Sequence, residues 1–205
     1  CIGSAGVALI PLLSTIKDDK GIILNYYFNG NIKTKTPLGK ELKIQIISDY
    51  PVNGKIKVLI SCESEEKFLI KIRKPSWAEN PMVNGVDYTE ENGYFILEKE
   101  WKENEILLDF KMTLKKEELN GKTAFSYGPL VLALDEGKGN KDIDKDICLA
   151  DEVGYLEKAK DGEMLRYRIK RVGGEDLIFT DYSSCGKNWE TSNSKTSVWL
   201  NVKTL

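Results

Sequence analysis

The 205-residue chain contains no histidine. This absence excludes a Ser-His-Asp triad, a Cys-His pair and any histidine-ligated metal that the chain would build alone. Long apolar runs are also missing, since none approaches the roughly 20 residues that a membrane-spanning helix needs. We therefore expect no membrane partner and none of the histidine-dependent hydrolytic sites.

The chain also lacks an excess of charge of either sign, because 30 basic and 32 acidic side chains leave a net charge of −2. A nucleic-acid surface needs a clustered basic footprint, whereas the lysines here are scattered among glutamates, so we expect no nucleic-acid partner. Cysteines are few and contain no Cys-x-x-Cys pair. Their wide spacing gives no disulfide framework, and we interpret them as buried free thiols, with two disulfides as the alternative. The four are Cys1, Cys62, Cys148 and Cys185.

What the chain does have is alternation of apolar and polar residues with a period of two. Phe68, Ile70 and Ile72 share one face of such a run, and two further runs follow before residue 112. This period predicts half-buried strands with one face on a core. Asn84-Gly85 and Asn92-Gly93 lie between the runs and tolerate the positive φ angles of tight hairpin turns. The pattern predicts an antiparallel β-sandwich.

The whole chain is predicted to be mostly β, with two antiparallel β-sandwich domains preceded by a short N-terminal helix. We place the helix within residues 1–19, the first sandwich at 20–115 and the second at 116–205, where Asn120-Gly121 marks a turn near its start. One run of the second sandwich is expected to have a basic, solvated face. In that run Leu165, Tyr167 and Ile169 alternate with Arg166, Arg168 and Lys170.

Several stretches resemble one family of carbohydrate enzymes. The first is Arg73-Lys74-Pro75-Ser76-Trp77-Ala78, followed by Val83-Asn84-Gly85, Gly93-Tyr94 and Trp101. Two later ones are Tyr127-Gly128-Pro129-Leu130-Val131 and the run from Thr180-Asp181-Tyr182 through Gly186 to Trp189 and Val198-Trp199-Leu200. Together they resemble glycoside hydrolase family 127, the β-L-arabinofuranosidases. The resemblance implies the C-terminal β-rich region that follows a catalytic helical barrel, and makes the N-terminal helix a remnant of that barrel.

The beginning of the chain, Cys1-Ile2-Gly3-Ser4-Ala5-Gly6, is similar to the end of the family's barrel, starting at the second of two adjacent cysteines. The resemblance implies that Cys1 is a zinc ligand in the intact parent enzyme, with the other ligands upstream and no cofactor in this fragment. Ser4 and Val7 depart from the family's usual Asn and Arg, which leaves the parent's substrate and activity open. A chain boundary that happens to include a cysteine, or a lipidated N-terminus, are the alternatives. We favour a cytoplasmic protein over a secreted or lipid-anchored one.

Candidate contact residues lie on the polar loop around Gly186. Asp181, Tyr182 and Trp189 are our candidates for touching a sugar or the barrel, because loops carry function more often than strands do. Packing inside the domain is the competing interpretation. Trp77 and Trp101 could offer sugar-stacking platforms, but large aromatic side chains at strand ends more often close a core.

No catalytic residue is assigned. Glycoside hydrolysis needs two carboxyl groups roughly 5 to 10 Å apart. No acidic residue here has the apolar sequence setting that marks a raised pKa, and Glu98, Glu100 and Glu103 resemble a solvated face.

We therefore expect a non-catalytic β-sandwich region of a β-L-arabinofuranosidase-like glycoside hydrolase, inactive by itself. Its partners would be the upstream barrel and carbohydrate, and its role would be to shape the barrel's sugar cleft. The resemblance implies that the parent removes terminal β-L-arabinofuranose by a retaining mechanism with a zinc-bound cysteine. The alternatives are a stand-alone carbohydrate-binding module and a surface-adhesion sandwich.

Overall fold

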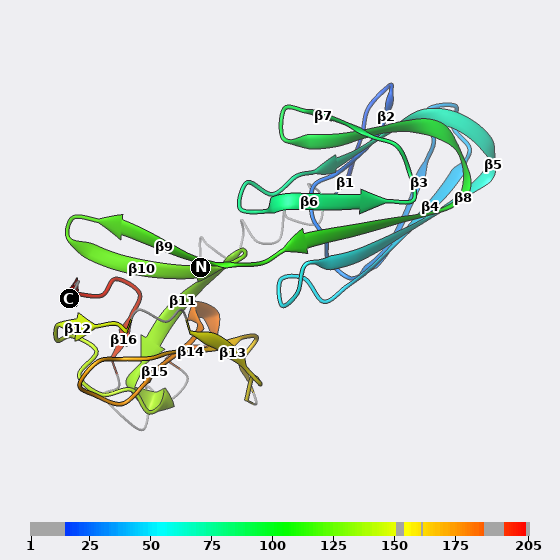
Figure 1. The fold of residues 1–205 in the computed structure, drawn as a ribbon. Coiled ribbons are helices and arrows are strands. Elements are labelled where there is room, and N and C mark those ends of the chain that lie inside the picture. Colours follow the sequence, from blue (N-terminus) through cyan, green and yellow to red (C-terminus); the bar gives the residue numbers. More distant parts are fainter. Residues whose placement is uncertain (1–14, 151–153, 161, 187–194, 204–205) are drawn as a thin grey trace, which may run out of the picture. The chain divides into compact units, whose positions relative to one another are not determined.

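The computed structural model describes residues 15–150, 154–160, 162–186 and 195–203, and these are mostly strands (Figure 1). Contacts between residues divide the chain into unit 1, Cys1–Met112, and unit 2, Thr113–Leu205. Each unit is built on a curled sheet, which confirms the predicted class of two β-sandwich-like domains. The predicted N-terminal helix lies largely outside the described residues. Within the last part of its predicted segment, Thr15–Lys17 form strand β1 and are not helical.

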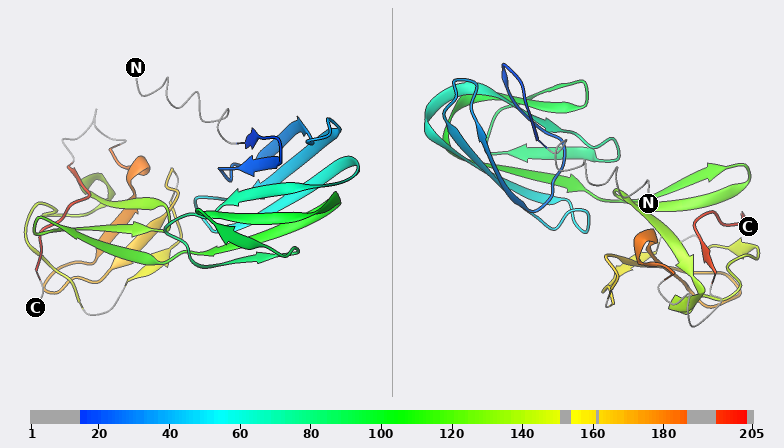
Figure 2. Two further views of the ribbon diagram at one scale, coloured as in Figure 1. Left: turned by 90° about the horizontal axis from the view of Figure 1, so that it is seen from above. Right: turned by 180° about the vertical axis from the view of Figure 1, so that it is seen from behind.

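Unit 1 is a single eight-stranded sheet (Figure 2). Its central path runs β1-β2-β5-β4-β3, β8 pairs with β5, and β6 and β7 both pair with β8. Pairing is antiparallel except between β2 and β5, which are parallel. The remaining strands are β2 (Gly21–Leu24), β3 (Gly30–Lys35), β4 (Glu41–Ser48), β5 (Lys55–Arg73), β6 (Glu79–Asn84), β7 (Thr89–Glu91) and β8 (Tyr94–Lys111).

Strands β5 and β8, of 19 and 18 residues, are long enough for each half of the strand to pair with different neighbours. The first half of β5 pairs with β4 and with the end of β8, and its second half pairs with β2 and with the start of β8. The register between β5 and β8 shifts between Ser61 and Glu66. Such an irregularity bends a strand pair and increases its twist. The sheet therefore curls over its own core, as the curved β5 and β8 ribbons show (Figure 1).

The core of unit 1 follows from the alternation along these two strands. Every second residue of β5 is buried from Ile56 to Cys62 and again from Glu66 to Ile72, on the two sides of the register shift. Burying each large apolar side chain stabilises the fold by about 1.5–3 kcal/mol relative to leaving it exposed. Trp101 is completely buried, and its indole N–H donates to the carbonyl oxygen of Phe68 at 2.9 Å. The prediction that Trp101 closes the core is confirmed.

Two hairpin turns have the geometry that their residues predict. Asn92 and Gly93, between β7 and β8, both have positive φ angles, 49° and 79°. Asn120 and Gly121 likewise have φ angles of 51° and 74°, and they join two strands inside unit 2. Two consecutive positive φ angles match the right-handed twist of the flanking strands, which explains the Asn-Gly pairs.

Unit 2 has a seven-stranded sheet in the order β13-β14-β15-β11-β10-β9, with β16 paired to β11. Strands β12 and β17 form a separate parallel pair. The core includes Phe125, Leu132, Leu134 and Phe179. The strands are β9 (Leu114–Leu119), β10 (Lys122–Tyr127), β11 (Leu130–Asp135), β12 (Ile147–Cys148), β13 (Tyr155–Glu157), β14 (Arg166–Ile169), β15 (Leu177–Asp181), β16 (Thr196–Ser197) and β17 (Val202–Lys203). Two 3-10 turns, η1 (Glu136–Lys138) and η2 (Tyr182–Ser184), follow β11 and β15.

The predicted basic, solvated face is wrong for Arg166 and Arg168 of β14, whereas Lys170, just after the strand, is exposed. Arg166 is only 4% exposed, and its guanidinium binds Glu157 at 3.2 Å and Glu163 at 3.1 Å. Arg168 is partly buried and binds Glu157 at 2.6 Å. Folding brings these carboxylates from β13 and from the loop before β14, and a buried guanidinium needs such partners. The alternation of apolar and basic residues along the strand is present, but the side chains that bury the basic face come from other segments.

Candidate functional site

Asp181, one of the predicted contact residues, ends β15 and is 1% exposed. Its Oδ1 accepts hydrogen bonds from the backbone N–H groups of Met164 at 2.9 Å and Leu165 at 3.1 Å. Its Oδ2 accepts from the hydroxyls of Ser183 at 2.6 Å and Ser184 at 2.7 Å. Both oxygens are thus engaged within unit 2, where they join the loop before β14 to turn η2.

These hydrogen bonds also decide the ionisation of Asp181. Burial by itself would raise the pKa of the carboxyl, because it disfavours the charged form. The two serine hydroxyls and the two backbone N–H groups outweigh burial, and they hold the pKa below its ordinary value. Asp181 is therefore a charged carboxylate at neutral pH, without the raised pKa expected of a general acid.

Tyr182 follows directly and is 59% exposed, so it can reach a ligand or another domain. Trp189 and Cys1, the other predicted site residues, lie outside the described residues. The structure thus brings Asp181 and Tyr182 together at the start of η2, with the first buried and the second at the surface.

Sequence reasoning missed the partners that hold this loop. Asp135, at the end of β11, accepts from the backbone N–H groups of Gly137 and Gly186, both at 2.8 Å. Asn140 donates to the carbonyl oxygens of Asp135 and Ile178, and it accepts from the N–H group of Ile178. The pattern of an Asp before a turn offered a signal for Asp135, which caps η1. Asn140 gave none.

A buried ion cluster lies behind the same loops. The side chain of Glu163 is inaccessible to solvent and binds Lys138 at 3.1 Å and Arg166 at 3.1 Å. Burial would raise the pKa of Glu163, but the backbone N–H group of Lys160 and the ammonium of Lys138 outweigh it and lower that pKa. Glu163 is therefore held in its charged form by partners from the same unit, without the raised pKa expected of a general acid.

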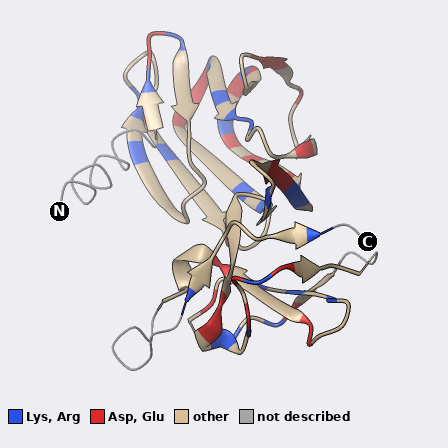
Figure 3. Cartoon of the chain, turned by 90° about the vertical axis from the view of Figure 1, so that its left-hand side faces the viewer, with Lys and Arg blue, Asp and Glu red and all other residues tan. Residues whose placement is uncertain are grey.

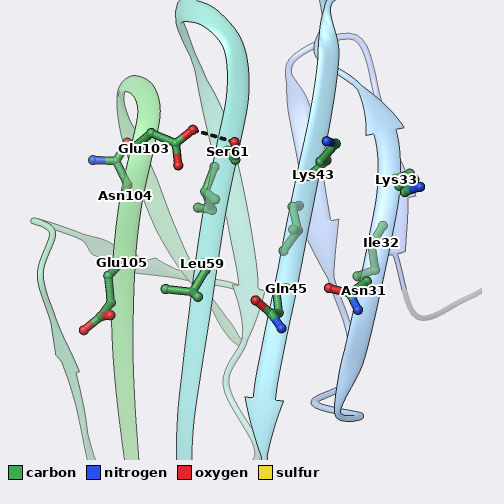
Figure 4. A pocket seen from close by; sticks show the side chains of 12 residues that line it. Asn31, Ile32, Lys33, Lys43, Gln45, Leu59, Ser61, Glu103, Asn104 and Glu105 are labelled. Atoms are coloured by element: carbon green, nitrogen blue, oxygen red, sulfur yellow. Dashed lines mark hydrogen bonds between the residues drawn. The ribbon is translucent and has the colours of Figure 1, made fainter.

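Unit 1 carries a hollow of about 800 Å³ on the outer face of β3, β4, β5 and β8 (Figure 4). Two rows of outward side chains cross these four strands, as the pairing registers show. The first row is Asn31, Gln45, Leu59 and Glu105, and the second is Lys33, Lys43, Ser61 and Glu103.

The carboxylates at one side of this hollow already have partners. Glu103 accepts a hydrogen bond from the Ser61 hydroxyl at 2.5 Å, and Glu105 binds Lys57 at 2.9 Å. Lys33 and Lys43 lie at the other side, directly opposite each other on β3 and β4. The arrangement offers amides, one hydroxyl and two cations for binding, and we assign it no chemical step.

The aromatic side chains tested as sugar platforms are divided between core and surface. Trp77 is half-buried against the core of unit 1 and stacks with Tyr50 at 6.3 Å between ring centroids, whereas Trp199 is 38% exposed. An aromatic pair that sequence reasoning missed is the partly buried Tyr26 and the exposed Phe28, stacked at 5.5 Å between ring centroids in the loop between β2 and β3. Strand β2 ends at Leu24, shortly before this pair.

Metal ligands are not gathered anywhere in the part of the chain that the structure describes, where no group of three or more His, Cys, Asp or Glu could hold an ion. The described residues therefore do not fit a zinc site. Lys, Arg, Asp and Glu are interspersed along the strands of each unit (Figure 3). Within the same described ranges, no helix is long and apolar enough to cross a membrane.

Solved structures with the same fold are glycoside hydrolases. A GH127 β-L-arabinofuranosidase from Geobacillus stearothermophilus T6 matches 96% of this chain with a TM-score of 0.79 and 21% identity. A protein described as a glycoside hydrolase matches 92% with a TM-score of 0.76 and 20% identity, and a GH127 β-arabinofuranosidase matches 95% with 0.73 and 18%. The chain spans only 36% or 37% of the length of those proteins. A comparison with curated proteins found no match.

The fold of this chain thus recurs in GH127 proteins as part of a longer chain. Residues 21–112, which make up most of unit 1, match the family model described as the middle domain of GH127 β-L-arabinofuranosidases. This match over residues 21–112 confirms the resemblance to GH127 that was drawn from the sequence.

Proposed function

We propose that this chain is the non-catalytic β-sandwich region of a β-L-arabinofuranosidase-like glycoside hydrolase. In the parent protein it would pack on a catalytic barrel and shape the sugar cleft of that barrel. The observation that carries the proposal is the GH127 middle-domain match over residues 21–112, within a chain whose fold matches 36% or 37% of the length of two longer GH127 proteins.

The chemistry of the described residues supports a non-catalytic role. Glycosidases need one carboxyl group to act as an acid and a second to act as a base or nucleophile. The buried carboxylates of unit 2, Asp135, Asp181 and Glu163, are bound by backbone, hydroxyl or cationic groups of the same unit. Zinc in the parent would need ligands from outside the described residues, such as the predicted ligand Cys1.

Tyr182 is our candidate for the contact with the barrel or its sugar. It is exposed, and the hydrogen bonds of Asp181 to Ser183 and Ser184 fix the turn that carries it. Tyr155, on β13 of the same unit, is 53% exposed and provides a matched control.

The test compares the 205-residue chain with the full-length product of its gene, using an aryl β-L-arabinofuranoside as the substrate. We expect turnover by the full-length protein and none by the chain. In the full-length protein, Tyr182→Ala should lower kcat/KM about tenfold, which corresponds to the loss of one good contact. Tyr155→Ala should change kcat/KM less than twofold, about the error of such comparisons.

Turnover by the isolated chain would refute the non-catalytic role. A full-length protein that is folded but inactive on arabinofuranosides would refute the proposed substrate class. Equal losses in the two tyrosine variants would remove Tyr182 from the proposed contact and leave the rest of the proposal standing.

A further inference from the structure

Lys33 and Lys43 bring two positive charges together on the sheet of unit 1. They are direct cross-strand partners, and like charges at such positions destabilise a sheet. Other lysines of the sheet reach carboxylates: Lys35 binds Glu41 at 3.0 Å, Lys57 binds Glu105 at 2.9 Å and Lys67 binds Glu98 at 3.6 Å. Across the described residues, no ion pair is recorded for Lys33 or Lys43. Their positive charge is left for an external anion to neutralise.

The neighbouring row supplies groups of a different kind. Asn31 and Gln45 are direct cross-strand partners two residues along β3 and β4 from the lysines, and their amides both donate and accept hydrogen bonds. Leu59 comes next in the same row and is half-buried at the floor of the hollow. Adjacent hydroxyl groups of a sugar can form hydrogen bonds with these amides, and the C–H face of a sugar ring can pack on Leu59.

The spacing of the two rows matches the repeat of a saccharide. Residues two apart on a strand are about 6–7 Å apart, on the scale of one sugar unit. A sugar carboxylate above Lys33 and Lys43 would therefore place the hydroxyls of the adjoining unit near Asn31 and Gln45 (Figure 4). The carboxylates of Glu103 and Glu105, already bound by Ser61 and Lys57, lie at the far side, away from the bound anion.

We propose that this hollow binds an acidic oligosaccharide, one whose sugar units carry carboxylate groups. An acidic protein segment is the competing occupant. The composition of the hollow disfavours a protein, because the buried centres of protein interfaces are depleted in Lys and Glu, and both line this surface. The proposal goes beyond the cleft-shaping role, since it uses residues of unit 1 alone and does not require a catalytic barrel.

The test measures binding of the 205-residue chain by isothermal titration calorimetry. The probes are an oligogalacturonate, a neutral arabino-oligosaccharide of equal length and a poly-glutamate peptide of equal charge. We expect the oligogalacturonate to bind most tightly and its affinity to fall as salt is added, because exposed charges are screened. The double variant Lys33→Gln, Lys43→Gln should weaken this binding about tenfold or more, as expected for losing charge-assisted hydrogen bonds.

The matched control is Lys67→Gln, Lys71→Gln, which makes the same charge change on the second half of β5. It should leave oligogalacturonate binding within about twofold, since these lysines lie outside the hollow. Circular dichroism spectra establish that each variant is folded.

Any of four results overturns the proposal. If the folded wild-type chain binds no oligosaccharide, the proposed site does not exist. If it binds the neutral and the acidic sugars with equal affinity, binding does not require the anion. An equal loss in both double variants shows unspecific charge attraction. Poly-glutamate that binds as tightly as the oligogalacturonate shows that the occupant is a protein.

Discussion

Unit 1 and unit 2 are both β units, but they bury different kinds of side chain. The described part of unit 1 buries Thr36 and Glu66 as its polar side chains, inside a core that is otherwise aliphatic and aromatic. Unit 2 buries a larger polar set: Thr123, Asp135, Asn140, Arg166, Thr180, Asp181 and Ser184. The first unit therefore depends mainly on apolar packing, and the second adds a network of buried hydrogen bonds and ion pairs.

Strand length explains much of this difference. Strands β5 and β8 have 19 and 18 residues, whereas β10 and β11, among the longest of unit 2, have six each. Short strands leave more backbone N–H and C=O groups at their ends, and buried groups of this kind need partners. In unit 2, Asp135, Asn140 and Asp181 supply those partners from their side chains.

The largest effect is expected in the core of unit 1. Trp101→Ala removes a fully buried indole and its hydrogen bond to Phe68, and should destabilise unit 1 by about 3–5 kcal/mol. Urea unfolding followed by circular dichroism measures the change. Trp199→Ala, at a partly exposed position of unit 2, should cost less than about 1 kcal/mol. Similar losses in the two variants would contradict the packing argument for unit 1.

In unit 2 the corresponding test removes charge and not volume. Asp181→Asn keeps the shape but replaces one accepting oxygen with an NH₂ group, which faces the hydroxyls of Ser183 and Ser184. We expect a loss of about 2 kcal/mol in the unfolding free energy of unit 2, from buried groups left without good partners. The same urea experiment detects it.

Asp176→Asn is the control for this variant. Asp176 lies at 3.7 Å from Arg168, and its side chain is partly exposed, so the loss should stay below about 1 kcal/mol. If Asp181→Asn were no more destabilising than this control, unit 2 would be held by apolar packing, as unit 1 is.

The sequence was sufficient to predict unit 1 to a large extent. The period of two along residues 56–62 and 68–72 and the Asn92-Gly93 pair are local signals; the structure contains both runs, joined in the single strand β5, and the turn. The apolar series is interrupted at the bend, where residues 63–67 are all polar, but the register shift between Ser61 and Glu66 was not predictable. A register shift depends on which partner strand each half meets, and a single strand's sequence does not contain that information.

Unit 2 was harder to predict for a related reason. Arg166 looked solvated from its own run, and its carboxylate partners come from Glu157 and Glu163 on other segments. Asp181 was predicted to be a contact residue. The groups that donate hydrogen bonds to its carboxylate include the backbone N–H groups of residues 164 and 165, on a separate loop. Buried polar networks are specified by three-dimensional proximity, so local periodicity indicates the elements and not their connections.

Acid should weaken unit 2 through the same buried carboxylates. The pKa values of Asp181 and Glu163 are both lowered by folding, so each contributes stability above its ordinary pKa, 3.8 or 4.5. That contribution disappears as the pH falls through the lowered values and the carboxylates become protonated. We expect the urea midpoint of unit 2 to drop between about pH 5 and pH 2, with a shallower drop in Asp181→Asn. A midpoint of unit 2 with the same acid dependence in the variant would exclude Asp181 as a source.

The smallest effect is expected at the one buried carboxylate described in unit 1. Glu66 occupies an inward position just past the bend of β5, where it accepts from the Thr36 hydroxyl at 2.6 Å and from the Leu38 backbone N–H group at 3.0 Å. Its ion pair with Lys40 is long, at 3.9 Å. Glu66→Gln retains an oxygen for Leu38 and should cost unit 1 only about 1 kcal/mol.

The control for Glu66 is Glu98→Gln on the exposed face, which loses only a surface ion pair to Lys67 and should change the unfolding free energy by less than about 0.5 kcal/mol. The informative comparison is with Asp181→Asn, because both substitutions remove a buried negative charge. A cost at Glu66 as large as the cost at Asp181 would mean that the bend of β5 depends on a polar anchor as much as the loops of unit 2 do. The contrast between an apolar unit and a polar one would then fail at the point where the long strands curve.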